Sequence, residues 1–177
     1  MIEQLKSDFN KMVENLKFSE SNVELRKKNL TNFIDKGFPN KRIEDWKFSD
    51  LNQIISSNIK NLSFYDDKTY KPREQISLID KFEHNKIIFI NGAISKVDIK
   101  HEDDTKVLIN NDLDLSNNTN EINPLVSLNH ALASAHIGII VKENYSLNKP
   151  LILYNITTED VNSTALNLRT DIKLEKN

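Results

Sequence analysis

The spacing of the apolar residues changes near residue 85, and this change constrains the fold more than any other feature of the sequence. Before it, apolar residues recur every three or four positions, which is the period of one face of an α-helix. After it, short β-branched runs are separated by turn residues, which is typical of β-strands. The sequence therefore predicts an α+β chain, with a mainly helical domain over residues 1–85 and a β domain over residues 86–177.

Two helices are expected at the start of the first domain. The apolar stripe of the first consists of Ile2, Leu5, Phe9, Met12, Val13 and Leu16. The second is expected to begin at Ser21, because Ser21 and Glu24 have the spacing of a capping box. Gly37 supplies the left-handed residue that commonly ends a helix, and Pro39 prevents the helix from continuing.

The second domain begins with a predicted β-hairpin. Residues 86–90 form a β-branched run that leads into Asn91-Gly92, and both of these residues tolerate the positive φ of a two-residue turn. The other expected elements are strands at 93–99, 107–109, 137–141, 151–156 and 164–174, and a short helix near 124–135. Strands separated by turns at roughly ten-residue spacing suit a β-sandwich or a β-solenoid.

The final predicted strand, residues 164–174, alternates apolar and polar residues. Its apolar face consists of Leu166, Leu168, Thr170, Ile172 and Leu174. A half-buried strand without neighbours exposes an apolar face and unpaired backbone groups. We therefore expect an earlier strand or a partner chain to cover it, or the sequence to be a truncated piece of a longer protein. The pattern favours truncation.

Composition and charge exclude several classes of function. The formal net charge is -2 without a basic footprint, which argues against binding to nucleic acid. The mean hydropathy of -0.53 and the absence of a long apolar run argue against a membrane span. The first residues do not resemble a secretory signal, and the chain contains no cysteine. A cytoplasmic protein is the simplest expectation.

No catalytic or metal-binding pattern is recognisable. His130 and His136 lie six residues apart, whereas two ligands on one helix face lie three or four apart. The acidic run that follows His101 is interpreted as a solvated polar turn. A Gly-x-Ser-x-Gly nucleophile elbow is absent. We therefore expect no enzymatic activity, no metal site and no cofactor held by this chain.

The densest group of unusual residues lies between Gly37 and Leu51 and contains the only tryptophan of the chain, Trp46. Its large apolar side chains, Trp46 and Phe48, have two interpretations. They pack the helical hairpin onto the following chain, or they form a docking surface, since Trp and Arg are enriched among the residues that dominate binding energy. We favour packing, which predicts that Trp46 is buried.

This segment resembles the N-terminal signature of the SufD members of the SufB/SufD family, which are subunits of the SUF iron–sulfur cluster assembly complex. The family pattern is Gly-[Leu/Phe]-Pro, a basic residue, Glu-[Asp/Ala]-Trp-[Lys/Arg]-[Tyr/Phe]-[Ser/Thr], and then Leu. The matching residues are Gly37, Phe38, Pro39, Arg42, Glu44, Asp45, Trp46, Lys47, Phe48, Ser49 and Leu51. Weaker similarities follow in the same order at residues 87–92, 128–141, 150–153 and 169–174.

The resemblance implies a fold and a set of partners. The fold is an N-terminal helical domain followed by the first turns of a right-handed parallel β-helix, here truncated. The function is that of a non-catalytic scaffold subunit, which joins a SufB-like subunit and a SufC-like ATPase in the full complex. The family residues tied to cluster assembly and ATPase docking lie beyond position 177, so the cluster is handled by the full complex. The matching residues from Gly37 to Phe48 are then structural or docking residues.

Two other functions stay open. One is a stand-alone cytosolic, β-rich protein-binding module that is unrelated to cluster assembly. The other is the front end of a β-solenoid enzyme that acts on carbohydrate. Such an enzyme needs carboxylates clustered on one face of the solenoid, and the scattered acidic residues argue against it.

Overall fold

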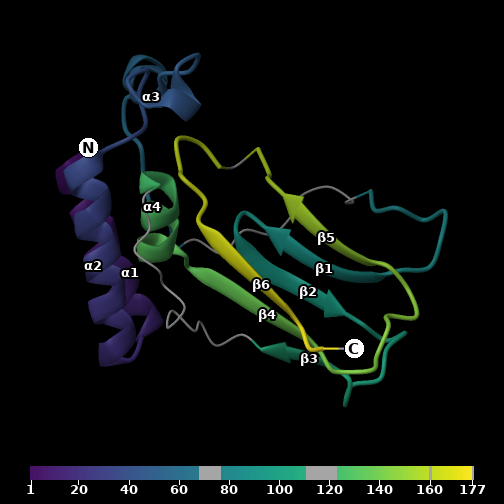
Figure 1. The fold of residues 1–177 in the computed structure, drawn as a ribbon. Helices are drawn as coiled ribbons and strands as arrows, with labels where there is room; N and C mark the ends of the chain where they lie inside the picture. The colour runs from purple at the N-terminus through teal and green to yellow at the C-terminus, as the bar shows by residue number, and fades with distance from the viewer. Residues whose placement is uncertain (68–76, 111–122, 160, 177) are drawn as a thin grey trace. The chain divides into compact units, whose positions relative to one another are not determined.

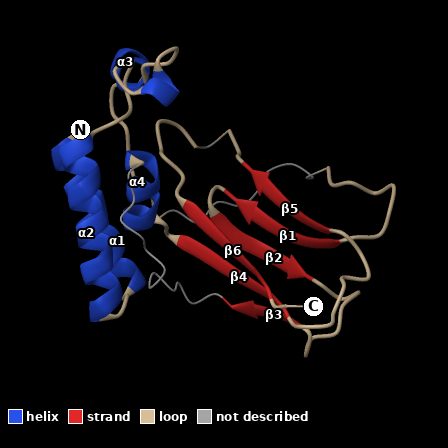
Figure 2. Ribbon diagram, viewed as in Figure 1, coloured by secondary structure: helices blue, strands red, loops and turns tan. Residues whose placement is uncertain are grey.

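The computed structural model describes residues 1–67, 77–110, 123–159 and 161–176 (Figure 1). The chain is α+β, with helices before strands except for one short helix among the strands (Figure 2). The helices are α1 (Ile2–Leu16), α2 (Glu20–Lys36), α3 (Leu51–Asn58) and α4 (Pro124–Leu132), with a 3₁₀ turn at Glu44–Trp46. The strands are β1 (Asn85–Ile90), β2 (Ala93–Asp98), β3 (Val107–Asn110), β4 (Ala135–Val141), β5 (Leu151–Ile156) and β6 (Leu168–Leu174).

The chain divides into two compact units, each built from separate stretches of sequence. The first unit comprises the described parts of Met1–Asp67, Asp114–Ser134 and Ser163–Asn167, and it contains the four helices. The second comprises the described parts of Lys68–Leu113, Ala135–Asn162 and Leu168–Asn177, and it contains the six strands. The short helix predicted near 124–135 is α4, which belongs to the first unit.

The start of α2 differs from the prediction, whereas its end agrees. Ser19, not Ser21, caps the helix, and its hydroxyl oxygen accepts a hydrogen bond from the Asn22 backbone N–H at 3.3 Å. Ser19 has extended backbone angles, so the helix has already begun when the chain reaches Ser21. At the other end Gly37 has a φ of 70°, and its N–H donates to the Phe33 carbonyl at 2.7 Å.

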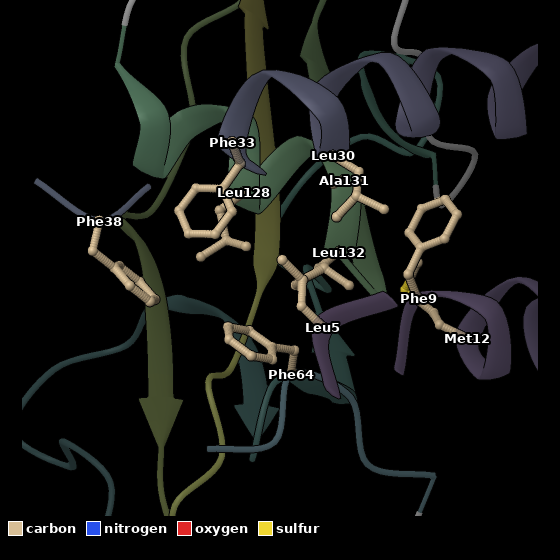
Figure 3. Packing of buried hydrophobic residues seen from close by; sticks show 10 residues of the cluster. All are labelled: Leu5, Phe9, Met12, Leu30, Phe33, Phe38, Phe64, Leu128, Ala131 and Leu132. Carbon is tan, nitrogen blue, oxygen red and sulfur yellow. The ribbon is translucent and has the colours of Figure 1, made fainter. Parts of the chain in front are cut away.

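The core of the first unit is formed by α1, α2, α4 and two irregular segments (Figure 3). Its buried residues are Leu5, Phe9, Met12, Leu30, Phe33, Phe38, Phe64, Leu128, Ala131 and Leu132. The middle of the stripe predicted for α1 is buried, while Ile2 and Leu16 at its two ends are exposed. The helical period therefore identified the buried face of α1 correctly.

A buried arginine connects α2 to the C-terminal end of α4. Arg26 is fully buried, and its two terminal nitrogens donate to the carbonyl oxygens of Ala131 and Ala133, each at 2.9 Å. Its Nε donates to Asn22 Oδ1 at 2.7 Å, and the guanidinium lies 3.9 Å from the centre of the Phe18 ring. The last carbonyls of a helix lack intrahelical partners and carry partial negative charge, so a cation is favourable there.

A buried carboxylate on α1, that of Asp8, binds the irregular segment at Ser63 and Phe64. Asp8 Oδ2 accepts a hydrogen bond from the Phe64 backbone N–H at 2.7 Å and a longer one from the Ser63 hydroxyl. Its other oxygen accepts from Gln4 Nε2 at 2.8 Å. A buried N–H without a partner is costly, so Asp8 makes the burial of Phe64 in the core possible.

The second unit contains two three-stranded sheets, with strand orders β2–β1–β5 and β3–β4–β6. The predicted hairpin is confirmed: Ile90 pairs with Ala93, and the two-residue turn has φ values of 50° at Asn91 and 81° at Gly92. The inner faces of the two sheets share one core, whose buried residues are Ile87, Phe89, Val107, Ile137 and Ile139.

The predicted right-handed parallel β-helix is wrong. Each sheet is mixed: β1 pairs antiparallel with β2 and parallel with β5, and β4 pairs antiparallel with β3 and parallel with β6. A parallel β-helix stacks parallel strands coil upon coil, whereas the Asn91-Gly92 turn brings β2 back antiparallel beside β1. The last strand begins at Leu168 and not at residue 164. Apolar patterning indicates where strands lie but not which strands pair, and the β-helix was expected from the family resemblance.

Glu102 links the segment after β2 to the loop before β5. Its carboxylate accepts hydrogen bonds from Asn85 Nδ2 at 2.6 Å, the Tyr145 hydroxyl at 2.9 Å, and the backbone N–H groups of Asn148 and Lys149 at 3.0 and 3.1 Å. The interpretation of this acidic run as a solvated turn is therefore wrong for Glu102. Burial raises the pKa of this carboxyl, but the four hydrogen bonds outweigh burial, so the pKa lies below its ordinary value of 4.5.

We expect Glu102→Gln to lower the free energy of unfolding at pH 7 by about 1–3 kcal/mol, because an amide oxygen cannot replace both carboxylate oxygens as acceptors. The folded-state pKa is depressed, so the carboxylate contributes its stability above the ordinary value and loses it as pH falls through the folded value. Urea unfolding of both proteins at pH 7, 5 and 4 should show the difference shrinking at the lowest pH. The exposed Asp104→Asn serves as the control, and a pH-independent difference would contradict this account.

Candidate functional site

The residues that match the SufD signature form a closed loop in the first unit. We call residues 40–50 the motif loop. Its ends meet because the Pro39 carbonyl oxygen accepts hydrogen bonds from the backbone N–H groups of Leu51 and Asn52, at 3.1 and 3.3 Å. Asp50 caps α3 by accepting from the Gln53 N–H at 2.9 Å, so the loop leads directly into a helix. The loop is therefore fixed at both of its ends.

The residues before the motif loop are buried. Phe38 packs edge-to-face against Phe33, with ring centres 5.0 Å apart and planes at 78°. Pro39 is fully buried beside it. The positive φ of Gly37 directs the chain out of α2 and into this position. These three signature residues thus attach the loop to the core.

Local hydrogen bonds order the loop itself. The Asn40 side chain accepts from the Arg42 N–H at 2.9 Å, and the Asn40 carbonyl accepts from the Ile43 N–H at 3.0 Å. The 3₁₀ turn follows, in which the Trp46 N–H donates to Ile43 at 2.8 Å. The Ser49 N–H then donates to the Trp46 carbonyl, also at 2.8 Å. The loop therefore has a defined shape of its own.

The side chains of the motif loop face solvent. Phe48 is 89% exposed, the most exposed large apolar residue among those described, and Ile43 is 39% exposed. Trp46 is half-buried. The exposed charged residues of the loop are Lys41, Arg42, Glu44, Asp45 and Lys47.

The structure therefore divides the signature into a buried part and an exposed part. The expectation that Trp46 and Phe48 pack the hairpin onto the following chain is wrong for Phe48 and holds only in part for Trp46. The physical reason is the closure at Pro39: Leu51 and Asn52 bond back to Pro39, so the loop closes on itself, and none of the described residues covers Phe48. The sequence could not indicate that Phe48 is more exposed than Trp46.

The motif loop presents an aromatic side chain next to charged groups. Lys47 Nζ lies 2.6 Å from Glu44 Oε1 and 5.3 Å from the centre of the Phe48 ring. An exposed aromatic ring with adjacent charges is the composition of a binding hot spot with a polar rim. Exposed ion pairs of this kind contribute little to stability, so the charges of the loop are not explained by folding.

A second polar cluster lies between β4 and β6 and was not identified from the sequence. His136 Nε2 and Asp171 Oδ2 are 2.9 Å apart, and Arg169 Nε lies 3.1 and 3.0 Å from the two Asp171 oxygens. The alternation of β6 placed Arg169 and Asp171 on one face, but their approach to His136 depends on a parallel pairing that no sequence pattern specifies. The bond between His136 and Asp171 joins the two strands and so supports their register.

Residues 1–67, 77–110, 123–159 and 161–176 contain no group of three or more His, Asp or Glu side chains placed to hold a metal ion. No helix within these ranges is long and apolar enough to cross a membrane. His130 and His136, considered above as a metal pair, lie in α4 and β4, in different elements.

Comparison with known proteins gave no relative: no protein-family model matches the chain, and no curated protein matches it.

Proposed function

We propose that this chain is a non-catalytic scaffold subunit of the SufD type, which acts in the cytoplasm by binding protein partners during iron–sulfur cluster assembly. The observation that carries the proposal is the exposure of Phe48 within a segment that matches the SufD signature at eleven positions. The proposed partners are a SufB-like subunit and a SufC-like ATPase. The proposal assigns no cofactor to this chain, and the cluster belongs to the full complex.

The geometry of the motif loop supports a docking role for its exposed part. A large apolar side chain that is exposed in the free protein gains most when a partner covers it, since burial of a phenylalanine contributes about 1.5–3 kcal/mol. The loop is ordered by its own hydrogen bonds, so binding needs little further ordering of its backbone. Phe48 is therefore the residue on which the proposal depends most.

We expect Phe48→Ala to weaken binding to the purified SufB–SufC partners at least tenfold, while changing the free energy of unfolding by less than about 0.5 kcal/mol. Isothermal titration calorimetry with the intact chain measures the first quantity, and urea unfolding measures the second. Ile54→Ala is the matched control, because Ile54 is a half-exposed apolar residue of the same unit, in α3 and outside the motif loop. Equal binding by both variants would contradict the docking role of Phe48.

The mixed sheets favour a second candidate function. The SufD resemblance implied a β-helix, which the described residues do not form. A protein-binding module unrelated to cluster assembly would use the same exposed loop with a different partner. If the folded wild-type chain fails to bind SufB and SufC in the titration above, the SufD proposal is wrong and the module is favoured.

A further inference from the structure

Among the described strands, β6 lies at the edge of its sheet. β6 pairs with β4 along one side, and no described strand pairs with its other side. Ile172 and Leu174 are opposite Ile139 and Val141 in this pairing, so they extend the apolar face of β4. The two β4 residues are buried, whereas Ile172 is 57% and Leu174 is 72% exposed. This edge thus exposes the continuation of a core face.

Alternate backbone N–H and C=O groups of β6 point away from β4, to the side where another strand could pair. The Glu175 N–H donates to the Val141 carbonyl at 2.9 Å, and the Asn167 carbonyl accepts from the Ser134 N–H at 3.2 Å. Odd-numbered residues of the segment therefore direct their peptide groups toward β4. Because successive residues of a strand alternate in this respect, the peptide groups of Ile172 and its even-numbered neighbours point to the open side.

The charges of β6 indicate what fits against this edge. The odd-numbered residues of β6 and of the position directly after it alternate in sign, as Arg169, Asp171, Lys173 and Glu175. In an antiparallel pair of identical strands with a two-fold axis at Ile172, Asp171 faces Lys173 of the second copy and Arg169 faces Glu175 of the second copy. All four charged residues then face a residue of opposite sign. The same register places Ile172 opposite Ile172 and Thr170 opposite Leu174.

Other registers lack this complementarity. With the axis moved by one residue to Asp171, two Asp171 carboxylates face each other and Arg169 faces Lys173. In a parallel, in-register pair, every charge lies beside the same charge of the other copy. Directly opposed like charges destabilise a strand pair, while opposite charges contribute about 0.2–1 kcal/mol each. Charged residues commonly protect an edge strand from pairing, but here their alternation selects one antiparallel register.

We propose that β6 is a self-association site, at which two copies of this chain pair antiparallel about a two-fold axis at Ile172. The pairing joins two three-stranded sheets into one sheet of six strands. It also covers the exposed Ile172 and Leu174 side chains of both copies on a common face. A two-fold axis is the usual symmetry for such a contact, because it brings the same surface of each copy together.

Single cysteines test this register directly, because the natural chain contains none. At the axis, the two Ile172 Cα atoms would be about 5.5 Å apart, within the range of a disulfide. The two Lys173 Cα atoms would be diagonal neighbours at about 7–8 Å, beyond that range. We expect oxidised Ile172→Cys to form a covalent dimer at least tenfold faster than Lys173→Cys, as measured by non-reducing electrophoresis. Both sites are exposed, so neither substitution should affect folding, which circular dichroism checks.

Sedimentation equilibrium tests the association without a cross-link. We expect the wild-type chain to form a dimer, and Lys173→Glu to weaken it at least tenfold by placing two carboxylates together on each side of the axis. Lys176→Glu is the control of equal charge change, since Lys176 lies opposite Leu168 in the proposed register. A wild-type chain that is monomeric at hundreds of micromolar, equal cross-linking of the two cysteine variants, or equal effects of the two charge changes would overturn the proposal.

Discussion

Arg26→Ala should lower the free energy of unfolding by about 3–5 kcal/mol, the range for substitutions that leave buried polar groups without a partner. The substitution leaves the carbonyls of Ala131 and Ala133 buried without their donor, and each unsatisfied buried acceptor costs about 1–3 kcal/mol. It also removes the contact of the guanidinium with the Phe18 ring, 3.9 Å from the ring centre. Urea unfolding followed by circular dichroism measures the loss.

Two further substitutions separate the contributions to this effect. Arg26→Lys retains the charge at the end of α4 but cannot reach both carbonyls with a planar fork, so we expect about half of the loss. Lys27→Ala is the control, because Lys27 is the next residue along α2 and its side chain forms an exposed ion pair with Glu24. Removing this side chain should cost less than about 1 kcal/mol. If Arg26→Ala behaved like Lys27→Ala, the guanidinium would not hold α4 in place.

Phe33→Ala is expected to cost about 3–5 kcal/mol, as is usual when a buried phenylalanine is truncated in a well-packed core. Phe33 lies in the core of the first unit and contacts the Phe38 ring edge-to-face. The cost should divide between a cavity beside Leu30 and Leu128 and the loss of the aromatic contact. Urea unfolding of the variant gives the total.

A double-mutant cycle isolates the aromatic contact. With Phe33→Leu, Phe38→Leu and the double variant, the coupling energy should be about 0.5–1.5 kcal/mol, the range for aromatic pairs of this geometry. Leucine fills most of the volume, so all three proteins should remain folded. A coupling energy near zero would mean that the hydrophobic effect alone buries Phe38, and that the edge-to-face contact adds no stability.

Local sequence features predicted local structure well. The stripe of α1, the turn at Asn91-Gly92 and the helix that begins at Pro124 each depend on residues close together in the sequence, and the structure confirms all three. The cap of α2 was placed two residues too late, at Ser21, because Ser19 and Ser21 are both acceptable caps. Which of them acts depends on where the chain leaves α1, at Lys17 with a φ of 50°.

Features that depend on distant residues were not predictable. Each sheet contains a parallel pair of strands that lie far apart in the sequence, β1 with β5 and β4 with β6. The alternation of apolar residues does not indicate which distant strands pair. Glu102 looked like any surface acid, and its four donors come from two distant segments, the start of β1 and the loop before β5. The segment that forms the motif loop was recognisable from its unusual residues. The exposure of Phe48 depends on the backbone closure at Pro39, which the amino-acid composition does not reveal.

The hydrogen bonds of Arg26 have a consequence for the order of events during synthesis. They join positions separated by 105 and 107 residues, and the intervening sequence contains three strands that belong to the second unit. On the ribosome, α2 therefore emerges long before the helix whose end it secures. Until residue 133 has left the exit tunnel, the guanidinium and the apolar face around Leu30 lack their native neighbours. A nascent chain halted before that point should be captured by chaperones and digested readily by protease, and protection should arise only with the later segment.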